Sequence, residues 1–348
     1  MNQNSLLFRS PIRVGVVGLG RAGVQIHIEA LRKHSDFYVT AVADPLESRR
    51  KEQATLLGAS AFASLDELVT SALCDVVVIA TPSRDHYSDA CKVLEAGIHC
   101  VLEKPMATNA REARELVARS KAKGLHLFVH HHYAYEGETL FLQEIIHSGR
   151  IGAVFHIDVF WTGFSRRWDW QTLQKNGGGQ LLNTCPHVLT LLLTLLGGDA
   201  TLESGRARLI KDAGDTEDDV RMFLRGCNGI TASVAVSSVC ALPMPRLTLH
   251  GSCGTLQENF TTATIRSFDP CAVRALKVID VAAPVDGSLT ETLPWKEEQV
   301  PVKPTSQGGT FYDNIAATLL QGASFRVDPG QAARIIEILE AIASQSRA

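Results

Sequence analysis

The sequence lacks an excess of charge of either sign: 34 lysine and arginine residues face 37 aspartate and glutamate residues, for a formal net charge of −3 over 348 residues. Surfaces that bind nucleic acid or anionic membranes need clustered positive charge. Long apolar runs are also missing, since the longest, residues 188–196, is far shorter than the roughly 20 residues that span a bilayer. We therefore expect neither nucleic acid nor a membrane as a partner.

Cysteines are present but unpaired in sequence, because none of the eight forms a C-x-x-C motif. Several lie in apolar runs, which is typical of reduced, mostly buried thiols. Residues 1–10 are too short and too polar to form a secretory signal. Together these features predict a cytoplasmic protein.

The length favours two domains, and the hydrophobic pattern changes near residue 133. Before it, five apolar runs alternate with amphipathic segments, at 12–17, 38–43, 75–80, 98–102 and 125–130. Continuous apolar runs such as 76–80 are typical of parallel strands covered by helices on both faces. Residues 1–133 are therefore predicted to form a doubly wound α/β domain.

Residues 134–348 have the pattern of an α+β domain with a large, mostly antiparallel, open sheet. Alternating strands are predicted at 154–162, 201–210, 219–224, 230–239 and 246–250, with a hairpin turn at 226–229. Helices are predicted near 138–148, 186–196, 310–321 and 330–345, and residues 283–308 look like a long irregular connection.

The first apolar run leads directly into G-x-G-x-x-G, with Gly18, Gly20 and Gly23 as its glycines. In this context the glycines permit a tight turn, a close approach to a pyrophosphate and close packing of helix on strand. Arg21 and Ala22 lie at the start of the following helix, whose free N–H groups attract phosphate. The pattern predicts a Rossmann domain that binds a dinucleotide.

The second strand ends at Asp44, 21 residues after Gly23, where this fold places the acid that accepts hydrogen bonds from the adenosine ribose. A carboxylate there binds a 2′-hydroxyl and repels a 2′-phosphate, so NAD is favoured over NADP. Arg49 and Arg50 follow and could bind a phosphate instead. They share their helix with other charged residues, which favours a solvated face.

Two further strands end in residues expected at the cofactor crevice, because ligands lie beyond the carboxyl ends of parallel strands. One is followed by Thr81, Pro82 and His86, and the other by Glu103 and Lys104. We predict that all five contact the cofactor. A lone Lys-Pro pair would more often be a surface turn.

The motifs G-L-G-R-A-G (18–23), A-D-P (43–45), A-T-P-S-x-x-H (80–86) and E-K-P (103–105) together resemble the glucose–fructose oxidoreductase, inositol dehydrogenase and rhizopine-catabolism (Gfo/Idh/MocA) family. G-R-I-G (149–152) and G-G-G-Q-L-L-N-T-C-P-H (177–187) extend the resemblance. It implies NAD(P)-dependent hydride transfer at a carbon of a sugar, cyclitol or related polyol. It also implies a homodimer or homotetramer formed through the open face of the second sheet.

The resemblance implies that Lys104 and His187 are catalytic. A histidine can take the hydroxyl proton as the hydride leaves, and an ammonium group can stabilise the developing alkoxide. His187 is expected in the first turn of a helix, where the dipole lowers its pKa. A structural histidine is the alternative.

Asn183 stands where many relatives have an aspartate, four residues before the histidine. An asparagine can orient a neighbour, but it cannot act as a base. We include Asn183 in the catalytic set, and its presence leaves the substrate class and the direction of reaction open.

Histidines at 130–132 precede Tyr133. Alternation along a strand allows His130 and His132 at most to share a ligand, and no nearby cysteine or aspartate completes a set, so no metal is predicted. Tyr133 is expected to reach the substrate. Trp168 and Asp169 are expected to line its pocket, unless their loop is simply anchored by tryptophan packing.

Three functions fit these observations. The first is an oxidoreductase of a sugar or polyol. The second is a glycoside hydrolase that uses NAD in a closed redox cycle, as some relatives do. The third is a regulator that senses dinucleotide or sugar without catalysis, a reading opposed by the retention of Lys104 and His187.

Overall fold

The computed structural model describes residues 8–211, 213–242, 244–278, 280, 282, 291–302 and 309–347. Most of the irregular connection predicted over 283–308 lies outside them. Its described part corrects the prediction, because it includes a strand, β14 (Lys296–Pro301).

The first sheet has six parallel strands in the order β3-β2-β1-β4-β5-β6, which confirms the doubly wound prediction. Its strands are β1 (Ile12–Val17), β2 (Phe37–Ala43), β3 (Ser60–Phe62), β4 (Val76–Ile79), β5 (His99–Leu102) and β6 (Leu127–Val129). The sequence pattern missed β3, because three residues with no buried side chain give no periodic signal.

Helices cover this sheet: α1 (Glu29–Leu31), α2 (Glu47–Leu57), α3 (Leu65–Thr70), α4 (His86–Glu95) and α5 (Ala110–Lys123). The α3 and α5 helices begin at Ser64 and Asn109, whose side chains accept N–H groups of the first turn. The segment after the glycine loop differs from the ordinary helix predicted there. Its first part, η1 (Ala22–Ile28), is a π-helix that buries His27 and Ile28.

The second sheet has eight strands in the order β14-β13-β12-β11-β7-β10-β9-β8. Within the described strands of this second sheet, only β7 and β10 form a parallel pair, so the mostly antiparallel prediction is confirmed. The strands are β7 (Val154–Thr162), β8 (Ala200–Arg208), β9 (Asp219–Gly226), β10 (Thr231–Ser237), β11 (Leu247–Gly251), β12 (Gly254–Glu258), β13 (Thr262–Ser267) and β14. The sequence analysis missed β12 and β13 but found the hairpin between β9 and β10.

One face of the second sheet packs in the core with α8 (Cys185–Leu195), while α6 (Gly137–Ser148) and the short α7 (Gln180–Asn183) lie beside α8. The opposite face carries His156, Asp158 and Arg221, together with the aromatic ring of Phe223.

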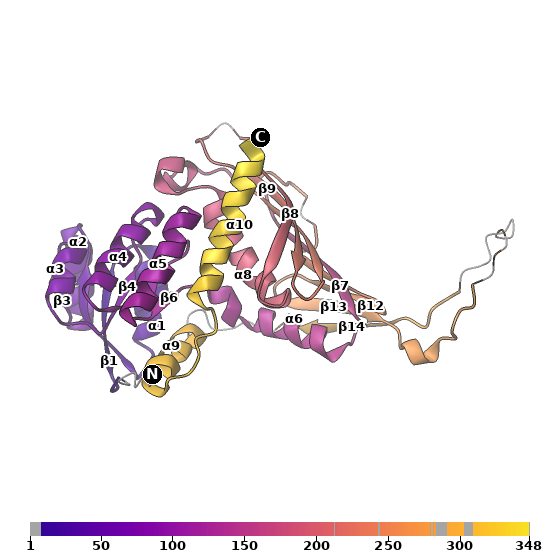
Figure 1. Cartoon of the computed structure of the whole chain (residues 1–348), viewed down its shortest axis with the longest axis horizontal. Helices are drawn as coiled ribbons and strands as arrows, with labels where there is room; N and C mark the ends of the chain where they lie inside the picture. The colour runs from indigo at the N-terminus through magenta and orange to yellow at the C-terminus, as the bar shows by residue number, and fades with distance from the viewer. Residues whose placement is uncertain are drawn as a thin grey trace.

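The last two helices connect the two sheets (Figure 1). Phe311, Tyr312 and Ile315 of α9 (Gly309–Gln321) pack in the same apolar cluster as β1 and β2 of the first sheet. The α10 helix (Pro329–Arg347) contacts both α5 and β8. The division predicted at residues 133 and 134 stays a prediction, and α9 packs on the first sheet although it follows the second. Among the described residues, no helix is long and apolar enough to cross a membrane.

Candidate active site

The glycine loop lies between the ends of β1 and β4, where the strand order of the first sheet reverses. Gly18 has a φ of +89°, and a Cβ there would lie 2.5 Å from the carbonyl oxygen of Ala80. A Cβ on Gly23 would lie 1.9 Å from the oxygen of Gly18, whereas none of the described atoms lies within 4 Å of a Cβ built on Gly20. The loop is therefore closed on the sheet side and open at Gly20, which suits a pyrophosphate.

Asp44 follows β2 and is buried. One carboxylate oxygen accepts the N–H of Leu19 and the other the N–H of Leu46, each at 2.9 Å. Asp44 thereby ties the glycine loop to the start of α2. A guanidinium nitrogen of Arg49 lies 3.9 Å from this carboxylate, while Arg50 bonds the backbone carbonyls of Asp44 and Pro45.

His86 joins the ends of β4 and β5. Its Nδ1 lies 2.7 Å from the carbonyl oxygen of Pro105, and its Nε2 lies 2.9 Å from that of Thr81. Thr81 in turn donates its hydroxyl to Asp89 at 2.8 Å. The ring therefore holds two loops together, and the cofactor contacts predicted for Thr81, Pro82 and His86 stay predictions, as do those of Arg21 and Ala22.

Lys104 reaches from the first sheet to the second domain. Its Nζ donates to the carbonyl oxygen of Asn183 at 2.8 Å and lies 3.4 Å from Asn183 Oδ1. The amide of Asn183 donates to Gln171 at 3.2 Å, and Glu217 accepts the N–H of Leu181 at 2.8 Å. Asn183 is therefore held in place at the end of α7 and orients the ammonium group.

His187 lies in the first turn of α8, with the rings of His132 and Tyr133 at 4.9 and 5.2 Å from its own. Among the described atoms, its Nδ1 is buried and has no hydrogen-bond partner. Burial and then the charge of Lys104 hold the pKa of His187 well below its usual value. Burial, rather than the helix dipole, is thus the main cause of a neutral, base-competent imidazole.

An aromatic wall missed by the sequence analysis continues from Tyr133. The Trp161 ring lies edge-on at 5.2 Å, and Phe260 lies 5.9 Å beyond. The guanidinium of Arg246 lies 4.9 and 3.9 Å from the Trp161 and Phe260 rings, and Glu138 binds it. Trp161 lies in β7, Phe260 lies in the turn between β12 and β13, and Arg246 directly precedes β11. Since Glu138 comes from α6, no local motif marks this group.

The loop predicted to line the pocket is exposed. Trp168 leaves 88% of its surface accessible, and Asp169 pairs with Arg167 at 2.5 Å and accepts the N–H of Gln171. The structure does not bring Trp168 or Asp169 into contact with His187, and their binding roles stay predictions.

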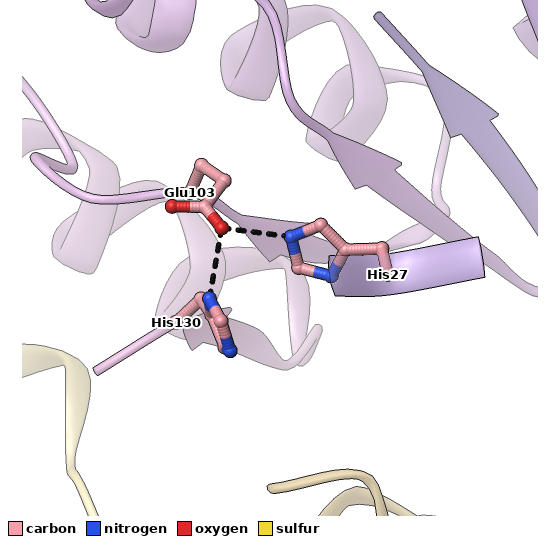
Figure 2. Close-up of side chains that lie close together, drawn as sticks. All are labelled: His27, Glu103 and His130. Carbon is pink, nitrogen blue, oxygen red and sulfur yellow. Dashed lines mark hydrogen bonds and ion pairs between the residues drawn. The ribbon is translucent and has the colours of Figure 1, made fainter. Parts of the chain in front are cut away.

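Glu103 turns away from the surface toward two histidines (Figure 2). His27, Glu103 and His130 offer one ligand atom each within 4.8 Å of one another. The nitrogens of His27 and His130 lie 2.9 and 2.8 Å from the same Glu103 oxygen. These distances suit hydrogen bonds, since ligands about 2.0–2.1 Å from a tetrahedral zinc lie roughly 3.3 Å apart.

The carboxylate beside His130 is that of Glu103, which the sequence analysis did not connect with the histidines. The two residues end adjacent strands, β5 and β6, and His27 comes from η1. The absence of a bound metal stays a prediction.

Comparisons with known proteins agree with this architecture. A family model described as an oxidoreductase family with an NAD-binding Rossmann fold matches residues 12–131. A second model, the GFO/IDH/MocA C-terminal domain, matches residues 139–257.

Among similar proteins, scyllo-inositol 2-dehydrogenase (NADP(+)) IolW of Bacillus subtilis is 23% identical over 97% of this chain and 94% of its own. D-glucoside 3-dehydrogenase of Escherichia coli is 28% identical in an aligned region that covers 56% of this chain and 56% of the dehydrogenase. The WlbA dehydrogenase of Bordetella pertussis, solved with NADH and UDP-GlcNAcA, has the same fold, with a TM-score of 0.75 and 24% identity over 97% of both chains.

Proposed function

The chain belongs to the Gfo/Idh/MocA family of NAD(P)-dependent oxidoreductases, and we propose that it moves a hydride between NAD and a hydroxyl-bearing carbon of a sugar, a cyclitol or a related polyol. One observation carries the proposal: Lys104, at the end of a cofactor-domain strand, bonds Asn183, four residues before His187. This bond ties the cationic donor to the segment that leads into His187, and the charge of Lys104 acts on the His187 imidazole, which supports a shared site for the two residues.

The glycine loop and Asp44 fit a dinucleotide, with open space at Gly20 for the pyrophosphate. When bound, the nicotinamide supplies a hydride acceptor, or a hydride donor in the reverse direction. We propose NAD as the preferred form, because the Asp44 carboxylate would repel a 2′-phosphate. The relatives differ: the Bacillus dehydrogenase is named for NADP, whereas WlbA was solved with NADH.

In the oxidation, the carbon loses its hydride and its hydroxyl loses a proton, so a carbonyl and one proton are formed. His187 is suited to take that proton, because burial keeps its imidazole neutral. Lys104 is suited to donate a hydrogen bond to the same oxygen as negative charge develops on it. Asn183 holds the ammonium group in place but carries no charge itself.

The substrate class rests on the relatives and on the aromatic wall. Two relatives are a scyllo-inositol dehydrogenase and a D-glucoside dehydrogenase. Tyr133 and Trp161 offer ring faces and edges on which the C–H surface of a sugar or cyclitol can pack. Because the chain spans about half of the glucoside dehydrogenase, a shared substrate is a proposal.

The test is NAD or NADP reduction over a panel that includes scyllo-inositol, other cyclitols and D-glucosides. We expect net turnover with at least one of them. Lys104→Ala and His187→Ala should each lower kcat by about a hundredfold or more, with NAD affinity changed little. Lys92→Ala and His147→Ala, at exposed positions of α4 and α6, are the matched controls.

Other outcomes favour the other two functions. Release of sugar from a glycoside without net NADH, in the presence of tightly held NAD, would identify a hydrolase with a closed redox cycle. Binding of dinucleotide and sugar without turnover in either direction would identify a sensor. In both cases the dehydrogenase proposal is wrong.

A further inference from the structure

Four buried side chains from four separate segments of the chain form one hydrogen-bonded chain beside Lys104. Tyr312 of α9 lies 2.7 Å from Nδ1 of His27, and Nε2 of His27 lies 2.9 Å from Glu103 Oε1. Nδ1 of His130 reaches the same oxygen at 2.8 Å (Figure 2). The exposed fractions are 0% for His27, 1% for Tyr312, 2% for His130 and 7% for Glu103, so water does not compete for these bonds.

The hydrogen atoms in this chain can be assigned from the chemistry of its members. An ionised Glu103 only accepts, so His27 Nε2 and His130 Nδ1 each donate an N–H to it. A neutral His27 then has a free lone pair on Nδ1, which accepts the hydroxyl of Tyr312. Glu103, His27 and Tyr312 thereby satisfy all three contacts, while Nε2 of His130 is buried and has no hydrogen-bond partner among the described atoms.

The expected ionisation agrees with this assignment. Burial would raise the pKa of Glu103, but His130 and the two N–H donors outweigh it and hold that pKa well below its usual range. Burial lowers the pKa of His27 despite the Glu103 hydrogen bond. Glu103 is thus a buried carboxylate that remains ionised because two imidazoles solvate it.

This carboxylate acts directly on the next residue. Glu103 Oε2 accepts the backbone N–H of Lys104 at 3.1 Å, while the Lys104 side chain extends to Asn183. In the described part of the chain, no carboxylate lies within ion-pair distance of Lys104 Nζ. Burial lowers the pKa of Lys104, and the charge of Glu103 opposes that effect.

We propose that Glu103 is a positioning residue for Lys104, and that His27, His130 and Tyr312 form the cradle that fixes its carboxylate. The cradle anchors the Lys104 backbone and supplies the negative charge that keeps the ammonium protonated in a buried site. The π-helical turn of η1 places His27 inward, so the helix that follows the glycine loop takes part in the cradle. This inference rests on the proposed function of Lys104.

The first experiment compares Glu103→Gln and Glu103→Asp, each in the wild-type and the Lys104→Ala background. Glu103→Gln should lower kcat at neutral pH by about tenfold or more and move the basic limb of the kcat–pH profile to lower pH. Glu103→Asp keeps the charge and should restore that limb in part. Both effects should vanish when Lys104 is absent, because Glu103 acts through it.

The matched control is His99→Gln, at the opposite end of β5 from Glu103. If Glu103→Gln lowers kcat equally at every pH, or lowers it as much without Lys104 as with it, the residue merely supports the fold and the inference is wrong.

A second measurement needs no substrate. Lys104 can be titrated by NMR of lysine-labelled protein, with its resonance assigned by Lys104→Arg. Glu103→Gln should lower the pKa of that resonance, and Tyr312→Phe, which removes one hydroxyl, should lower kcat several-fold with little change in KM. An unchanged Lys104 titration would overturn the inference. If instead the titration shifts but no panel compound turns over, only the proposed function fails.

Discussion

Removal of the Asp44 carboxylate should reverse the choice between the two dinucleotides. In NAD this carboxylate is expected to accept hydrogen bonds from the ribose hydroxyls, and a bond to a charged group contributes about 1.5–3 kcal/mol. Asp44→Ala should therefore lower the affinity for NAD by roughly thirtyfold, which corresponds to about 2 kcal/mol of binding free energy.

The affinity for NADP should increase in the same variant. The repulsion between a carboxylate and a 2′-phosphate about 4 Å away is removed, and at an effective dielectric of 20 this amounts to as much as about 4 kcal/mol. Arg49, 3.9 Å from the carboxylate in the structure, becomes free to bind the phosphate. The ratio of the two affinities should therefore change by more than the thirtyfold loss of NAD alone.

Isothermal titration calorimetry with both dinucleotides measures this ratio. Asp44 also accepts two backbone N–H groups, so Asp44→Ala costs stability, and its thermal midpoint must be recorded without cofactor. Arg49→Ala in the Asp44→Ala background should abolish the gain in affinity for NADP. Glu47→Ala, at the exposed start of α2, is the control and should change the affinity for neither dinucleotide. Tighter binding of NADP than of NAD by the wild type, or an equal loss of both in Asp44→Ala, would refute the reasoning.

Two further predictions concern stability and assembly. Burial lowers the pKa of His131 to about 3, so the unfolded chain binds this proton first as the pH falls below about 6.5. The free energy of unfolding should therefore fall from there toward pH 3 by up to about 1.4 kcal/mol per pH unit. His131→Gln can still donate to Thr190, and urea unfolding should show that it reduces the pH dependence of this free energy by the equivalent of one proton. An unchanged pH dependence contradicts the assignment. We also expect a homodimer or homotetramer that forms through the outer face of the second sheet. Light scattering should give a mass above that of a monomer, and Phe223→Asp should reduce that mass. A monomeric wild type would rule the assembly out.

The sequence was sufficient for elements and motifs that are local. Five of the six strands of the first sheet follow from continuous apolar runs, and the dinucleotide loop follows from its glycines and the acid at Asp44. Lys104 and His187 follow from motifs that also carry the family resemblance. The β3 strand was missed, because none of its three side chains is buried, whereas the equally short β6 lies in an apolar run.

The rest depends on contacts between distant segments. The bond from Lys104 to Asn183 joins residues 79 positions apart, and that from His27 to Tyr312 joins residues 285 apart. Neither spacing has a periodic signature. Glu103 illustrates the limit, since its position at a strand end suggests the cofactor crevice, while its side chain lies in a cradle of histidines.

The packing of α9 on the first sheet has a consequence for biosynthesis. The strands of the dinucleotide domain leave the ribosome first, yet Phe311 and Tyr312, which complete their apolar cluster, are about 180 residues behind β6. At about 5–20 residues per second, that interval lasts on the order of 10 to 40 s. During it the nascent domain exposes an apolar surface and lacks the hydroxyl that closes the Glu103 cradle. A chain released before α9 would therefore need a chaperone and would expose this surface to aggregation.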